Sequence, residues 1–278
     1  MAYKHNKTTK TLGPQAAHLI TTLHDEDRVT FRLKDIQRIL GLNDVSARNF
    51  IRKLVDRGVV TRLKPGLFIL VPFELGKETE YAGNPLVLAR ELANGNDYYL
   101  SHGTAMEIHG MVTQPQFVIH VATPKKTRTT QVMGTEFQFI HCKSEWLFGL
   151  INHWVTKQEK VVVSDLERTA IDGLRQPKHC GGVSEVGKGI WMRREAIHVN
   201  RLIGYALKLG VGAVIRRLGY MMELYEIGSQ ADRKILLQHL SDTYVRLDPT
   251  LPAEGKFIRK WRLQLNLSAD ELLSVVRT

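Results

Sequence analysis

The 278-residue sequence contains few cysteines and no long apolar run, and both absences exclude classes of protein. Its two cysteines, Cys142 and Cys180, are too few for a disulfide-stabilised scaffold. No apolar stretch approaches the roughly 20 residues that a membrane-spanning helix requires. The basic start MAYKHNKTTK is not followed by an apolar segment, so we expect no secretory signal. These absences favour a cytoplasmic protein without a membrane partner.

The sequence also lacks repeats of fixed period and low-complexity tracts. Its length and its 43% apolar content predict a folded chain that divides into two domains. With 39 Lys+Arg against 28 Asp+Glu the formal charge is +11, which favours polyanionic partners and nucleic acid above all. Residues 1–75 carry 13 basic and 7 acidic side chains, so this quarter of the chain holds about half of the excess charge.

Helical patterns dominate the first 60 residues. Apolar residues recur at helical spacing from Pro14 to Leu23, and again in the segment LKDIQRIL, which Gly41 ends. After a tight turn, Asp44 is a suitable N-cap for a third helix from about Val45 to Arg57, with Gly58 as its stop.

The third helix carries a face suited to reading DNA. Ala47, Leu54 and their apolar neighbours form the expected buried stripe, which leaves Arg48, Asn49 and Arg52 together on the outer face. Arginine can bond two acceptors on guanine, and asparagine can pair with adenine, in the major groove. We expect these side chains to reach base edges and the flanking Ser46 and Lys53 to hold phosphates.

A hairpin is expected after this helix. The run GVVTRLKPGLFILVP contains two β-prone segments joined at Lys64-Pro65-Gly66-Leu67, which would place Arg62 and Lys64 at the tip. The order of helices, turn and hairpin is typical of a winged helix-turn-helix, whose wing lies along the phosphates. A charged helix is by itself usually a solvated face, but the agreement of several features favours DNA binding here.

The remainder of the chain mixes helices and strands. Patterns predict a helix after Ser101, strands over QFVIHVATP and EFQFIHC, and mostly helix over RLIGYALKLGVGAVIRRLGYMMELY. We therefore predict a mixed α+β protein with a winged helix-turn-helix in residues 1–75 and a larger mixed α/β domain in residues 85–278.

Other possible sites in this part are weaker. Lys125, Lys126 and Arg128 form a basic loop between two strands and are secondary candidates for phosphate or an acidic partner. His102 with His109, and the pairs His141-Cys142 and His179-Cys180, lack the spacing of a metal site, so we expect no metal and no cofactor.

Two further motifs suggest enzymes. Asp165 and Glu167 follow a strand, as Mg²⁺-binding acids of nucleases do, but Ser164 with Glu167 also fits a capping box, and Arg168 with Asp172 an ion pair. The segment GVSEVGKG resembles a phosphate-binding loop but has Gly189 where Ser or Thr is required, and we interpret CGGVSEVGKG as a flexible connection.

Several stretches, YYLSHGTAMEIHGM, VVVSDLERTAIDGLRQPKHCGG, YALKLGVGAVIRRLGYMMELY and WRLQLNLSADELL, resemble the AbiEi family over nearly the whole chain. These are antitoxins and autorepressors of type IV abortive-infection toxin-antitoxin systems.

The resemblance implies a non-enzymatic repressor of its own operon that binds double-stranded operator DNA, expected to contain inverted repeats. It also implies a C-terminal domain that antagonises a nucleotidyltransferase-like toxin, and it leaves direct contact with the toxin open. A Mg²⁺-dependent nucleic-acid enzyme targeted by the winged helix, and a ligand-sensing regulator without a toxin, are the alternatives.

Overall fold

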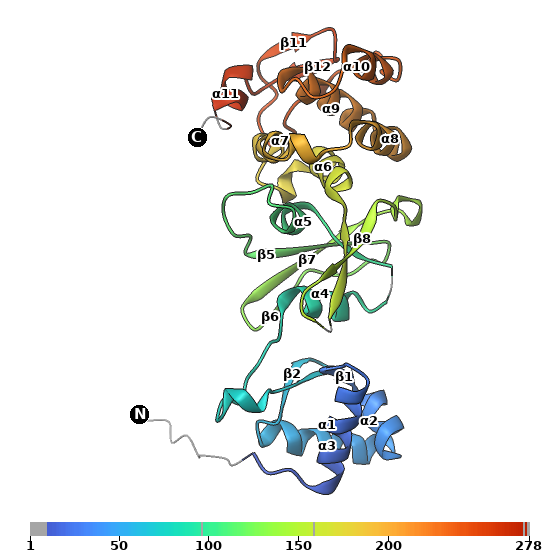
Figure 1. Ribbon diagram of the computed structural model, residues 1–278, viewed down its shortest axis with the longest axis vertical. Helices are drawn as coiled ribbons and strands as arrows, with labels where there is room; N and C mark the ends of the chain where they lie inside the picture. Colours follow the sequence, from blue (N-terminus) through green and yellow to red (C-terminus); the bar gives the residue numbers. More distant parts are fainter. Residues whose placement is uncertain (1–9, 96, 158, 275, 277–278) are drawn as a thin grey trace. The chain divides into compact units, whose positions relative to one another are not determined.

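A computed structural model describes residues 10–95, 97–157, 159–274 and 276 of the chain (Figure 1). The first residues of the stretch in which we expected no secretory signal, 1–9, lie outside this description. Helices and strands alternate irregularly, which confirms the expected mixed α+β class. The chain forms two compact units, and the first contains the chain up to Leu92 with Gln131–Thr135 and Trp154–Lys160. We had assigned residues 85–92 to the second domain.

The first unit begins with helices on a small sheet. Its elements are α1 (Pro14–Asp25), β1 (Thr30–Arg32), α2 (Leu33–Leu40), α3 (Asp44–Asp56), β2 (Val60–Lys64), β3 (Leu67–Leu70), the 3₁₀ turn η1 (Phe73–Leu75) and α4 (Pro85–Ala93). The strands form an antiparallel sheet of order β1-β3-β2. The sequence patterns predicted α1, α2, α3 and the hairpin, whereas β1 was missed because three residues are too short for a periodicity.

One apolar core holds these elements together. Leu19 and Leu23 of α1, Ile36 of α2 and Leu54 of α3 are buried with Phe31 of β1. Because the buried positions of α3 lie on one side, its opposite side is left to solvent.

The ends of α3 are fixed by local hydrogen bonds. Asn43, not Asp44, is the N-cap, and its side chain accepts a hydrogen bond from the Ser46 amide at 2.9 Å. Asp44 is instead the first helical residue. At the other end Gly58 adopts φ +65°, and the amide of Val59 donates to the Leu54 carbonyl, a Schellman arrangement that only a residue tolerant of positive φ completes without strain.

The second unit contains most of a six-stranded mixed sheet of order β6-β7-β5-β4-β9-β8. The strands are β4 (Tyr99–Leu100), β5 (Val118–Thr123), β6 (Thr130–Val132), β7 (Thr135–His141), β8 (Leu150–Trp154) and β9 (Lys160–Ser164). Strand β5 runs parallel to β7 and antiparallel to β4. Helix α5 (His102–Ile108) follows β4, and the 3₁₀ turn η2 (Ser144–Trp146) precedes β8.

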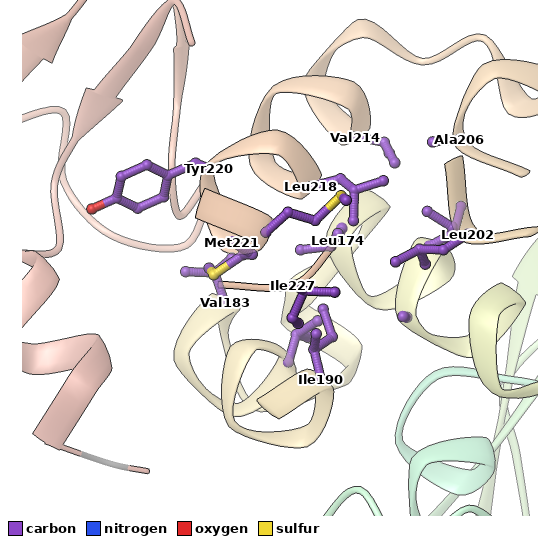
Figure 2. Packing of buried hydrophobic residues seen from close by; sticks show 14 of the residues in the cluster. Leu174, Val183, Ile190, Leu202, Ala206, Val214, Leu218, Tyr220, Met221 and Ile227 are labelled. Atoms are coloured by element: carbon purple, nitrogen blue, oxygen red, sulfur yellow. The ribbon is translucent and has the colours of Figure 1, made fainter. Parts of the chain in front are cut away.

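A helical layer follows the sheet in sequence. It consists of α6 (Leu166–Arg175), η3 (Pro177–His179), α7 (Val183–Met192), η4 (Arg194–Ala196), α8 (Val199–Leu209), α9 (Gly212–Leu224) and α10 (Gln230–Leu237). Leu174, Ile190, Leu202, Leu218 and Met221 meet in its core (Figure 2). The prediction that CGGVSEVGKG is a flexible connection is wrong. Val183–Met192 forms the helix α7, and five of its residues are buried.

The C-terminal segment closes this core. Strands β10 (Val245–Arg246), β11 (Lys256–Ile258) and β12 (Leu263–Leu265) form a sheet of order β10-β12-β11, followed by α11 (Ala269–Ser274). Trp261 is 1% exposed and lies so close to Gly219 of α9 that no Cβ atom fits there. The Asp248 carboxylate accepts a hydrogen bond from the first amide of α7 at 2.7 Å. Residues after 245 therefore complete the helical core.

Candidate nucleic-acid interface

The face of α3 opposite the core carries the residues that the sequence singled out. Arg48, Asn49, Arg52 and Lys53 are exposed and Ser46 is half-buried, while Ala47, Ile51 and Leu54 of the same helix are buried. The face therefore presents two guanidinium groups, an ammonium group and a side-chain amide to solvent.

Contacts within the helix orient two of these side chains. The Arg48 guanidinium donates from Nε to the Asp44 carboxylate at 2.8 Å, and Arg52 donates to the Asn49 side-chain oxygen at 3.5 Å. Both members of the Arg48–Asp44 pair are more than half exposed, so the pair contributes little to stability. Its consequence is to hold Arg48 toward the N-terminal end of α3. The partner role of Asp44 was missed, because the sequence favoured it as the cap.

Arginines from two elements line one groove. Arg48 and Arg52 of α3 and Arg62 of β2 border a groove of about 500 Å³ between the helix and the hairpin. Its apolar lining includes Ile51, Val55, Leu33 and Phe68. A groove bordered by three arginines and lined by apolar side chains offers guanidinium groups that can pair with phosphate oxygens or with acceptors on base edges.

The hairpin differs in detail from the expected one. Arg62 pairs with Phe68 within the strands and is exposed toward the groove, whereas Pro65 and Gly66 form the tip. A register shift between Arg62 and Lys64 inserts one extra residue into β2. Lys64 is half-buried, and burial together with the charge of Arg32 lowers the pKa of its ammonium. Arg62 is therefore the more exposed of the two hairpin cations.

The secondary basic candidates lie in the second unit. Lys125, Lys126 and Arg128 are exposed in the connection between β5 and β6. The Lys125 ammonium donates to the Asn94 carbonyl at 2.9 Å, so it fastens this loop to the segment before β4. The structure does not bring these residues into the groove of α3, whose lining comes entirely from residues 33–68.

The carboxylates considered for an enzyme have structural partners. Asp165 is the N-cap of α6, where it accepts from the Arg168 amide and from the Tyr205 hydroxyl, at 2.8 and 2.9 Å. Ser164 therefore does not cap the helix as expected. Glu167 is 2% exposed and accepts from the His198 amide at 2.8 Å. In the described part of the chain no cluster of His, Cys, Asp and Glu has the spacing to hold a metal ion.

A histidine cluster was not expected from the sequence, because its members lie far apart along the chain. The rings of His102, His120 and His179 have centroids 5.3 to 6.4 Å apart. Burial lowers the pKa of His102 well below its usual value and that of His120 and His179 to about 4. His109, which we had considered beside His102, bonds instead to the Ser164 carbonyl.

We expect this cluster to make the protein acid-labile. The folded pKa values lie below the ordinary 6.5, so the unfolded chain binds more protons below that pH. The stability is fully present above about pH 6.5 and is lost as the pH falls toward 4, by at most about 3 kcal/mol for His120. Urea titrations from pH 7 to 4.5 measure this loss. His120→Gln should make the free energy of unfolding depend less on pH, whereas His18→Gln, an exposed control, should not change that dependence. If His120→Gln and the wild type depend equally on pH, buried His120 is not the cause of the acid lability.

Comparison with known proteins shows a likeness of fold. No family model matches the chain, and no curated protein matches it. Among solved structures the chain is similar to the Rv2827c protein from Mycobacterium tuberculosis, over 99% of this chain and 98% of that one, with a TM-score of 0.67 and 16% identity. None of the helices in the described ranges has the length and apolarity of a transmembrane span. At this identity the likeness shows that both chains share one mixed α+β fold from end to end.

Proposed function

We propose that the first unit is a winged helix-turn-helix and that the protein is a sequence-specific DNA-binding repressor of the cytoplasm. One observation carries the proposal: arginines of α3 and β2 converge on a single groove, beside Asn49 on the exposed face of α3. The order α1-β1-α2-α3-β2-β3 supports it, because it supplies a helix for the major groove and a hairpin for the flanking phosphates.

Each side chain has a distinct role in this proposal. Arg48, Asn49 and Arg52 address base edges from the solvent face of α3. Ser46 and Lys53 hold the adjacent phosphates. Arg62 and, closer to the tip, Lys64 bind the backbone from the wing. Because phosphate contacts position the protein and base contacts specify the sequence, the two groups have separable effects on binding.

Selection from random double-stranded DNA tests the proposal directly. The full chain should enrich one sequence family, and fluorescence anisotropy should show an affinity at least about 1000-fold higher for that family than for random DNA. The expected family contains inverted half-sites. If no sequence is enriched at low salt, where phosphate contacts are strongest, the assignment of the first unit to DNA binding is wrong.

The wing is tested by the salt dependence of binding. Arg62→Ala should weaken binding to all DNA sequences alike and reduce the slope of log K against log salt by roughly one, since one phosphate contact is lost. Lys77→Ala is the matched control, because Lys77 is exposed in the same unit but does not line the groove. If the slope of log K against log salt is the same for the wild type and for Arg62→Ala, the wing does not contact the DNA.

For the second unit we propose the antitoxin role that the AbiEi resemblance implies. The protein would then repress its own operon and antagonise a nucleotidyltransferase-like toxin. Co-expression is the test: the full chain should restore growth of cells that express such a toxin from the neighbouring gene, and a variant defective in DNA binding should still do so. If the full chain does not restore growth, the antitoxin role is wrong, and the protein is better described as a transcription factor that acts without a toxin.

A nuclease is less well supported than a repressor. Asp165 and Glu167 are engaged as a helix cap and as a buried acceptor for the His198 amide, so neither carboxylate is directed to a substrate. Mg²⁺-dependent nicking of a plasmid that is lost in Asp165→Asn would reverse this preference. A ligand-sensing regulator instead predicts a rise in thermal stability on addition of a small effector.

A further inference from the structure

An exposed valine lies in the first turn of α3. Val45 is 68% exposed, and it belongs neither to the apolar core of the first unit nor to the lining of the groove. Beside it, the Asp44 carboxylate accepts from the Arg48 guanidinium, and the backbone amide of Ser46 donates to the Asn43 side chain. Val45 is thus an apolar side chain directed to solvent at the polar end of the helix.

Stability of the helix does not explain a valine at this position. Valine is a poorer helix former than alanine, lysine, arginine or glutamate, because its branched Cβ restricts χ1. Its side chain is mostly exposed and adds little apolar burial to the folded state. A side chain that costs helix propensity without burial is better explained by a contact that forms on binding.

The position of Val45 relative to Asn49 indicates what that contact is. Residues separated by four positions lie next to each other on one helix face, so Val45 lies one turn before Asn49 on the same exposed row. The first turns of a helix inserted in the major groove lie nearest the base edges. In that groove the apolar feature of the bases is the C5-methyl group of thymine, and the partner suited to asparagine is adenine.

We propose that Val45 is a specificity-determining residue that packs against a thymine methyl group, within one base pair of the adenine bound by Asn49. This inference rests on the proposed DNA-binding function and deepens it. It predicts that each half-site has an A·T base pair at the position that faces the N-terminal turn of α3. Arg48, turned toward the same end of the helix by Asp44, then addresses the neighbouring base pair.

Chemical substitution of the DNA tests the contact without altering the protein. Once the bound sequence is selected, each thymine is replaced in turn by deoxyuridine, which removes only the methyl group. At one thymine per half-site the affinity of the wild type should fall about fourfold, the factor expected for one buried methyl-sized group. Replacement of the other thymines should change the affinity less.

A variant of the protein identifies the partner of that methyl group. Val45→Ser should bind thymine and deoxyuridine DNA equally at the sensitive position. Leu75→Ser, a control at another exposed apolar residue of the first unit, should keep the wild-type difference. Circular dichroism melting curves establish that each variant is folded.

The outcomes separate this inference from the proposed function. If DNA is bound specifically but no thymine is sensitive, or if Val45→Ser retains the sensitivity, the valine contact is refuted while the repressor stands. If no sequence is enriched at all, both are refuted.

Discussion

Simultaneous replacement of Arg48, Asn49 and Arg52 by alanine should lower the affinity for the selected DNA sequence by at least about 100-fold, because each base contact contributes about 1 to 3 kcal/mol. Affinity for random DNA should fall less, since Lys53 and Arg62, the phosphate contacts of the proposed interface, are unchanged. The ratio of specific to non-specific binding should therefore collapse. Fluorescence anisotropy at fixed salt, with both DNA types, measures this ratio.

The control variant changes the same residue types elsewhere. Arg193, Asn200 and Arg259 are exposed in the second unit, and their replacement by alanine removes the same charge. We expect this control to keep the wild-type ratio. If the α3 variant keeps the wild-type ratio of specific to non-specific affinity, α3 is not the recognition helix. This conclusion holds even if the loss of positive charge weakens binding to both kinds of DNA.

Asp172→Asn should destabilise the protein by about 3 to 5 kcal/mol, because it leaves a buried guanidinium without its counter-charge. Arg168 and Asp172 both have side chains that are 0% exposed, joined by two contacts of 3.1 Å. The Tyr99 hydroxyl accepts from Arg168 and donates to Asp172, each at 2.9 Å. Arg168 also lies 4.3 Å from the centroid of the Phe148 ring.

The free energy of unfolding from urea titration gives the size of the effect. Glu145→Gln serves as control, because the Lys143–Glu145 pair is 62% and 69% exposed and should contribute less than about 1 kcal/mol. Arg168→Met combined with Asp172→Leu should recover part of the loss, since an apolar pair has no charge to desolvate. A loss below about 1 kcal/mol for Asp172→Asn would show that the buried Arg168–Asp172 pair contributes no more to stability than an exposed pair.

The sequence predicted local structure best at residue types with a narrow conformational preference, such as glycine at positive φ and proline in a turn. Gly41 and Gly58 adopt φ +64° and +65° at the expected ends of α2 and α3, and Pro65 and Gly66 form the expected turn. Ser268 and Glu271, three residues apart as the pattern of a capping box requires, make that capping box before α11. Asn43 and Asp44 are equally good caps, so the sequence alone did not decide between them.

Prediction failed where partners distant in sequence decide the structure. The glycines of CGGVSEVGKG suggested flexibility, yet Gly189 lies within α7. A Cβ atom there would be 2.7 Å from the Met111 carbonyl oxygen, so close packing and not flexibility accounts for the glycine. The first amide of that helix, at Val183, donates to Asp248, 65 residues away. The spacing of Arg168 and Asp172 predicted an ion pair but not its complete burial. Likewise, the pattern indicated the arginines of α3 but not that Arg62 faces the same groove.

The dependence of the helical core on residues after 245 has a consequence for synthesis. The first unit can fold as soon as the ribosome has released it, because its core comes mainly from one early stretch of the chain. The helical core instead stays open until Asp248 and Trp261 have emerged to meet α7 and α9. The helices that begin with α6 at Leu166 then lack part of their core until Trp261 has been made, so the two units mature at different times.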